Sequence, residues 1–166
     1  MEIVAMLQNS ELFKGLAPGY LNKVSGYCVG RSFNPDSLIF KEGDPATDLY
    51  VLTGGRVALE TEVRPIADLP AISFSVETIV EGGVLGWSAI VEPHVYTRSA
   101  RCLSNCALLA IKGEILSKVM REDPAFGFEL MKRLSALISR RLTNTQLRLV
   151  NVIGVAMLEK DIKARV

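Results

Sequence analysis

Histidine and cysteine are scarce in this chain of 166 residues, which has one histidine and three cysteines. One histidine is too few for a metal site of several histidines, and it gives little support for a catalytic Ser–His or Cys–His pair. Cys28, Cys102 and Cys106 lack the short paired spacing of zinc or iron–sulfur ligands. We expect reduced thiols, no bound metal and no enzymatic activity. His94, in the EPHVY loop, is expected to face solvent rather than hold haem.

Excess charge and long apolar runs are also lacking. The formal net charge is +1, whereas nucleic-acid binding depends on many uncompensated lysines and arginines. No stretch approaches the roughly 18 to 20 apolar residues that a membrane span requires. The N-terminal MEIVAMLQNSELFKGL mixes acidic and polar residues with its apolar ones, unlike a signal peptide. We therefore expect a cytoplasmic protein that binds neither membrane nor, by itself, DNA.

The patterns along the chain predict a single domain, residues 1–166, in three parts. Residues 1–30 carry apolar positions at helical spacing and predict short N-terminal helices. Residues 31–112 contain short apolar runs between turn residues, which are typical of an antiparallel barrel or jelly roll; the runs are SLIF, LYVL, RVALE, ISFSV and ALLAI. The stretch RPIADLPAISF predicts a long hairpin excursion. Residues 113–163 are helical, with Pro124 suited to the first turn of a long helix.

That long helix carries apolar residues at the spacing of a coiled coil. The seam has steps of 4, 3, 4, 3 and 4 and consists of Ile138, Leu142, Thr145, Leu149, Val152 and Ala156. Such a seam predicts a homodimer through residues 126–158, because so small a barrel cannot cover the whole helix. The alternative is a helix that lies on its own barrel.

Five stretches together resemble the cyclic-nucleotide-binding domain of the catabolite activator protein (Crp/Fnr) family, over nearly the whole chain and in the same order. They are LFKGL, IFKEGDPATDLYVLTGGRVAL, VLGWSAIVEP, TRSARC and FELMKRLSALISRRL. The resemblance implies an eight-stranded antiparallel β-roll (jelly roll) between short N-terminal helices and a long C-terminal dimerisation helix, a mainly β fold with flanking helices. Transcription factors of that family carry a helix-turn-helix domain after this helix. The present sequence ends earlier, so we expect a protein partner rather than direct DNA binding.

The same resemblance implies which residues bind a ligand. A helical turn whose backbone N–H groups face the cyclic phosphate matches Gly86, Trp87, Ser88 and Ala89. The opposite wall matches Arg98, Ser99 and Ala100, where Arg98 would pair with the phosphate. Thr145 matches a threonine of the long helix that touches the base; the full set of candidates is Gly86, Trp87, Ser88, Ala89, Arg98, Ser99, Ala100 and Thr145.

Trp87 departs from the family pattern, because it stands where the family has a glutamate that holds the ribose hydroxyl. An indole donates one hydrogen bond but accepts none as a carboxylate does. We therefore expect a non-enzymatic regulatory sensor or adaptor with weak or no cyclic AMP binding, and no cofactor other than a cyclic nucleotide or another small anionic ligand. One alternative is a working cyclic-nucleotide receptor in which Trp87 is tolerated or stacks on the ligand. Another is a jelly-roll metalloenzyme, which a metal-free elemental analysis would exclude.

Overall fold

The computed structural model describes residues 2–63 and 71–164, with side chains in the last helix as far as Gly154. Residues 64–70, most of the predicted hairpin excursion, lie outside the described residues. The elements in chain order are α1 (Glu2–Gln8), α2 (Pro18–Ser25), β1 (Val29–Phe33), β2 (Leu38–Phe40), β3 (Asp48–Gly54), β4 (Val57–Val63), β5 (Ile72–Ile79), β6 (Val84–Leu85), the 3₁₀ helix η1 (Trp87–Ile90), β7 (Ser99–Cys102), β8 (Cys106–Lys112), α3 (Gly113–Glu122) and α4 (Pro124–Ala164).

The strands form two four-stranded sheets in which every pairing is antiparallel. One sheet has the order β1-β8-β3-β6 and the other β2-β7-β4-β5. Each apolar run that predicted a strand lies in one: SLIF in β2, LYVL in β3, RVALE in β4, ISFSV in β5 and ALLAI in β8. The predicted fold class, an eight-stranded roll with flanking helices, is therefore confirmed for the described residues.

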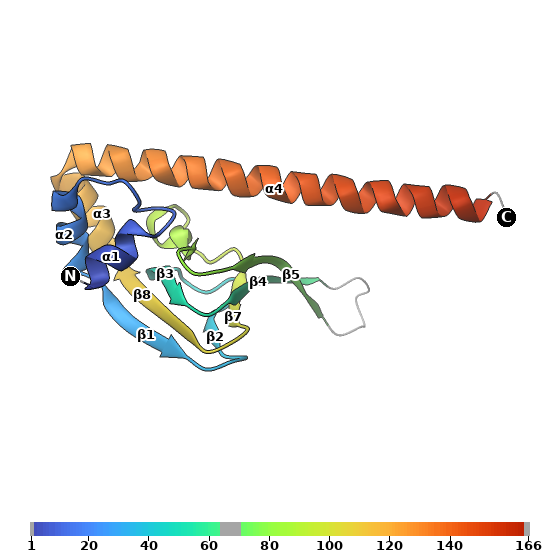
Figure 1. Ribbon diagram of the computed structural model, residues 1–166, viewed down its shortest axis with the longest axis horizontal. Helices are drawn as coiled ribbons and strands as arrows, with labels where there is room; N and C mark the ends of the chain where they lie inside the picture. The colour runs from blue at the N-terminus through green and yellow to red at the C-terminus, as the bar shows by residue number, and fades with distance from the viewer. Residues whose placement is uncertain (1, 64–70, 165–166) are drawn as a thin grey trace.

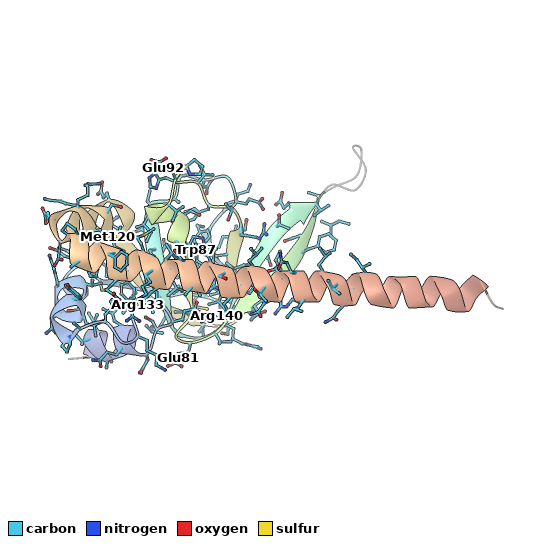
Figure 2. The ribbon with its side chains drawn as sticks, turned by 90° about the horizontal axis from the view of Figure 1, so that it is seen from above. Glu81, Trp87, Glu92, Met120, Arg133 and Arg140 are labelled. Atoms are coloured by element: carbon cyan, nitrogen blue, oxygen red, sulfur yellow. The ribbon has the colours of Figure 1, made fainter. Side chains whose placement is uncertain are left out.

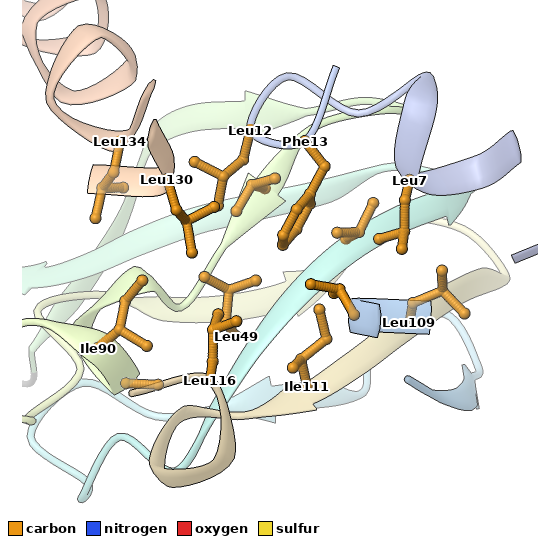
Figure 3. Packing of buried hydrophobic residues seen from close by; sticks show 14 of the residues in the cluster. Leu7, Leu12, Phe13, Leu49, Ile90, Leu109, Ile111, Leu116, Leu130 and Leu134 are labelled. Carbon is orange, nitrogen blue, oxygen red and sulfur yellow. The ribbon is translucent and has the colours of Figure 1, made fainter. Parts of the chain in front are cut away.

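The core consists of two hydrophobic clusters, a smaller one between the two sheets and a larger one between the first sheet and the helices. The larger cluster positions α4. Leu7, Leu12 and Phe13 come from the N-terminal segment, and Leu49 and Ile111 from the sheet, and all are completely buried. Figure 3 shows these side chains facing Leu130 and Leu134 of α4 across the core. Burial of this continuous apolar cluster fixes the start of α4 on the roll.

Helix α4 divides into a packed and a free half. Asp123 caps its start by accepting the Phe126 N–H at 3.1 Å. Phe126, Leu130, Leu134 and Leu137 are buried at steps of 4, 4 and 3, which places one face of the helix on the core. Arg141 is the last buried residue of the described part of α4. The helix then extends well past the roll (Figure 1), and its apolar residues from Leu142 to Ile153 are exposed.

The cysteines are free thiols. Cys102 and Cys106 are buried in β7 and β8, and Cys28 is half-buried. Burial raises the pKa of Cys28 from its ordinary value of 9.0 to about 11, because a thiolate is poorly solvated there. It raises the pKa of Cys102 to about 12, with Cys106 adding to the effect. Neither thiol is therefore ionised near neutral pH, as a reactive cysteine would be.

Among the described residues, no helix combines the length and the apolar character needed to cross a membrane.

Candidate functional site

A turn after β6 builds one wall of the candidate cradle. Gly86 adopts φ 75° and is followed by η1, with the Ala89 N–H bonded to the Gly86 carbonyl at 3.0 Å. A Cβ at Gly86 would lie 2.7 Å from the Asp48 carbonyl oxygen, so both the backbone conformation and the space require glycine. The predicted helical turn is present, and its first residue is fixed by this close approach to β3.

Two adjoining cavities lie against this turn, and they share Leu59, Trp87, Thr97, Arg98 and Arg141. The inner cavity, of about 50 Å³, is lined by Phe40, Leu59, Leu85, Gly86, Trp87, Ser88, Tyr96, Thr97, Arg98 and Arg141. The outer cavity, of about 170 Å³, is lined by Leu59, Val76, Glu77, Trp87, Thr97, Arg98, Ile138, Arg141, Leu142 and Thr145. We call the two together the cradle. Its floor is aromatic, since the rings of Phe40 and Tyr96 stack with centroids 3.9 Å apart.

The structure brings five of the eight candidate residues together in the cradle. Gly86, Trp87 and Ser88 line it from the turn, Arg98 from the start of β7, and Thr145 from α4. The Thr145 hydroxyl donates to the Arg141 carbonyl of its own helix at 2.9 Å, so its proton is already engaged.

The other three candidates line neither cavity. Ala89 and Ala100 are buried in the hydrophobic clusters. Ser99 is buried too, and its hydroxyl oxygen accepts the Glu42 N–H at 3.0 Å. Its contact is with the Glu42–Gly43 turn, so Ser99 positions the wall that carries Arg98 rather than lining the cradle.

The indole of Trp87 is paired with a guanidinium from α4. Arg141 Cζ lies 4.7 Å from the centre of the Trp87 ring, which is a cation–π contact. Figure 2 shows Trp87 next to the middle of α4. The position that the resemblance matches to a carboxylate therefore holds an aromatic ring that an arginine covers.

Arg141 is the central residue of the site, and it was missed as a candidate from the sequence. It is only 8% exposed. One Nη atom donates to Glu11, by an ion pair, and to the Val84 carbonyl at 2.6 Å, while Nε lies 3.5 Å from Glu77. Arg140 also pairs with Glu11, at 2.9 Å. The sequence did contain a signal that Arg141 is buried. Arg141 lies four residues after Leu137 and so continues the spacing of the buried apolar residues of α4.

Arg98 differs from Arg141 in having no carboxylate partner. Within the described part of the chain it makes no ion pair, and its one hydrogen bond is a 3.3 Å contact to the neighbouring Thr97 carbonyl. A half-buried, always protonated guanidinium without a counter-charge is suited to an anionic ligand.

A third cavity, of about 440 Å³, shares no lining residue with the cradle and lies between the β2–β3 loop, η1 and α3. Its lining is Ala46, Thr47, Ala89, His94, Lys112, Glu114, Ser117 and Arg121. Lys112 there is already paired with Asp48 at 3.1 Å. His94 is exposed, with Nδ1 3.2 Å from the Ser88 carbonyl. The described residues contain no group of three or more His, Cys, Asp or Glu side chains that could hold a metal ion.

The family model described as "Cyclic nucleotide-binding domain" matches residues 30–123. The matched segment includes the turn and Arg98, and it ends before α4 and Arg141. No curated protein matches the chain.

Solved structures have the same fold. A protein from Geobacter metallireducens GS-15, described as cyclic nucleotide-binding, is 27% identical with a TM-score of 0.71, and the match covers 86% of this chain and 99% of that one. The catabolite activator protein of Thermus thermophilus is 26% identical with a TM-score of 0.69; the match covers 86% of this chain and 63% of the Thermus chain. A cyclic nucleotide-binding domain from Methylobacillus flagellatus KT has a TM-score of 0.74 at 17% identity over 90% and 81% of the two chains, a likeness of fold.

Proposed function

Because the chain belongs to the cyclic nucleotide-binding domain family, we propose that it is a non-enzymatic regulatory sensor or adaptor whose cradle is modified at Trp87. The observation that carries the proposal is the contact between Trp87 and Arg141. It fills the position of the ribose acceptor from both sides, with an indole from the turn and a guanidinium from α4. The remaining space supports the same conclusion, since cavities that bury drug-sized ligands measure about 300 to 1,000 Å³ and the two here measure about 50 and 170 Å³.

The wild-type protein is therefore expected to bind cyclic AMP and cyclic GMP weakly or not at all. Calorimetric titration with each nucleotide tests this directly. Saturation at micromolar nucleotide would contradict the modified cradle and would support the alternative, a working receptor.

One observation favours that alternative. Glu77 of β5 lines the outer cavity, so it supplies the carboxylate that Trp87 does not. The Glu77 carboxylate lies 3.5 Å from the Arg141 Nε, which is a long ion pair. Its oxygens are therefore free to accept a hydrogen bond from a ligand hydroxyl as well. A receptor that uses Glu77 would lose its nucleotide affinity in Glu77→Gln. The proposed sensor has no such affinity to lose.

We further propose that the protein acts as a homodimer, paired through residues 126–158, and signals to a protein partner. The support is the seam of α4, where Leu149 and Val152 are exposed, while Ile138 and Leu142, which are also partly exposed, border the outer cavity. The side chain of Ala156 lies outside the described residues. An exposed apolar stripe at coiled-coil spacing is the usual surface for pairing of two helices.

Direct DNA binding by this chain is not expected, because a net charge of +1 leaves no excess of lysine and arginine to neutralise phosphates. The measurement is retention of labelled duplex DNA by the purified chain at physiological ionic strength. Salt-dependent retention there would contradict the expectation and point to a basic surface on the free half of α4.

A further inference from the structure

The cradle carries one positive charge without a carboxylate partner among the described residues, that of Arg98, because Arg141 is paired with Glu11 and Glu77. Arg98 and Arg141 line both cavities, and Glu77 is the one acidic residue among the side chains that line either of them. Because both arginines line a cavity of only about 50 Å³, we expect a single small group placed there to lie within reach of both side chains. An oxyanion with one negative charge would neutralise the excess.

One nitrogen of Arg141 is available for such a group. Its Nε and one Nη are engaged by Glu77, Glu11 and the Val84 carbonyl. The other, Nη1, is buried and has no hydrogen-bond partner among the described residues. Buried charged donors are nearly always hydrogen-bonded, so an unpartnered one on a side chain that lines both cavities indicates a missing acceptor.

The rest of the outer cavity determines what can be attached to the oxyanion. Leu59, Val76, Ile138 and Leu142 give it apolar walls, and the Trp87 indole adds an aromatic one. Its volume of about 170 Å³ is below the range that nucleotide-sized ligands occupy. The volume and the apolar walls therefore fit a ligand whose remaining part, which we call its body, is short and apolar and contains no ribose.

We propose that the cradle binds a small organic anion, with one oxyanion head between Arg98 and Arg141 and a short apolar body against Trp87, Leu59 and Leu142. The inference rests on the proposed function, because it assumes that the cradle is the ligand site of the sensor. A carboxylate and a phosphate monoester both present oxyanion oxygens, the first with one negative charge and the second with up to two, and the walls select the body in either case.

Fluorescence of Trp87 tests the proposal without interference, because it is the only tryptophan in the chain. The probes are benzoate and phenyl phosphate, which combine head and body, with benzamide as the uncharged analogue and inorganic phosphate as the head alone. A saturable change is expected with benzoate or phenyl phosphate. Benzamide and inorganic phosphate are expected to bind at least about tenfold more weakly, since each lacks one half of the contacts.

Arg98→Gln is the informative variant, since Arg98 has no ion pair whose loss would unfold the protein. It should weaken binding of the better probe roughly ten- to a hundredfold. Arg56→Gln is the matched control, because Arg56 is exposed in the β3–β4 turn and lines neither cavity. It should leave binding unchanged. Arg141→Gln should also weaken binding, and its circular dichroism spectrum shows whether it has kept its fold.

Several results would overturn the inference. One is no saturable response of the wild type to either probe, and another is equal binding by Arg98→Gln and the wild type. If both probes fail while cyclic AMP binds at micromolar concentration, the ligand class is wrong and the working receptor is favoured. If the probes fail and cyclic nucleotides fail too, the cradle is not a ligand site and the sensor half of the proposed function falls as well.

Discussion

Leu149→Glu is expected to convert a dimer into monomers and so to halve the mass measured by sedimentation equilibrium. Leu149 is 59% exposed in the free half of α4, at the centre of the predicted seam. In a two-stranded pairing it would meet its own copy, and two carboxylates facing each other in a dry interface cost several kcal/mol. The same residue in a monomer is on the surface, so the fold of the roll should be unaffected.

Leu147→Glu provides a matched control for that experiment. Leu147 is also 59% exposed on the same helix, and the two-residue step from it to Leu149 corresponds to a rotation of about 200°. It therefore lies on the opposite side of the helix from the seam and should leave the dimer intact. A dimer that survives Leu149→Glu but dissociates in Leu147→Glu would place the interface on that other face.

The structure also shows why the heptad seam and the self-packing alternative were both reasonable interpretations of one sequence. Leu130, Leu134 and Leu137 pack on the core of the same chain. The seam lies on a neighbouring stripe of the helix, and from Leu142 onward it is exposed. Helix α4 therefore has two apolar stripes, one that packs on the roll and one that the roll leaves exposed. Hydrophobic spacing alone does not show which of the two stripes a small roll covers.

The strands were predictable where they are long and apolar, as in β3 and β8. Strand β6 has only two residues, Val84 and Leu85, and its pairing with Tyr50 and Val51 is a tertiary contact that no local pattern encodes. Strand β1 begins at Val29, and four of its five residues are exposed, so it lacks the apolar alternation of a half-buried strand.

The sequence predicted where the candidate site lies better than it predicted which side chains line it. The turn at Gly86 and the arginine at position 98 do face a common cavity. Ser99 follows Arg98 directly, and neighbouring residues in an extended chain point to opposite sides, so both could not line it. Arg141 was missed because a buried arginine is identified by its partners, and Glu11, Glu77 and Val84 come from three distant segments.

Trp87→Glu is expected to raise the affinity for cyclic AMP roughly ten- to a hundredfold over the wild type. A hydrogen bond to a charged acceptor is worth on the order of 1.5 to 3 kcal/mol, which corresponds to one to two powers of ten in the dissociation constant. The structure adds a reason why the new carboxylate would be held in place. The Arg141 guanidinium lies over the ring that is removed, and its Nη1 is buried with no hydrogen-bond partner in the described part of the chain.

Trp87→Ala separates the two consequences of that substitution, because it removes the indole but supplies neither a hydrogen-bond acceptor nor a negative charge. Calorimetric titration of the wild type and both variants with cyclic AMP and cyclic GMP is the measurement. A gain in Trp87→Glu alone means that the acceptor was missing, whereas an equal gain in both variants means that the indole blocked the site. No gain in either variant means that the walls around Leu59 and Leu142 have also closed on the nucleotide. Tight binding by the wild type that is lost in both variants would reverse the interpretation, since the indole would then stack on the ligand as part of a working site.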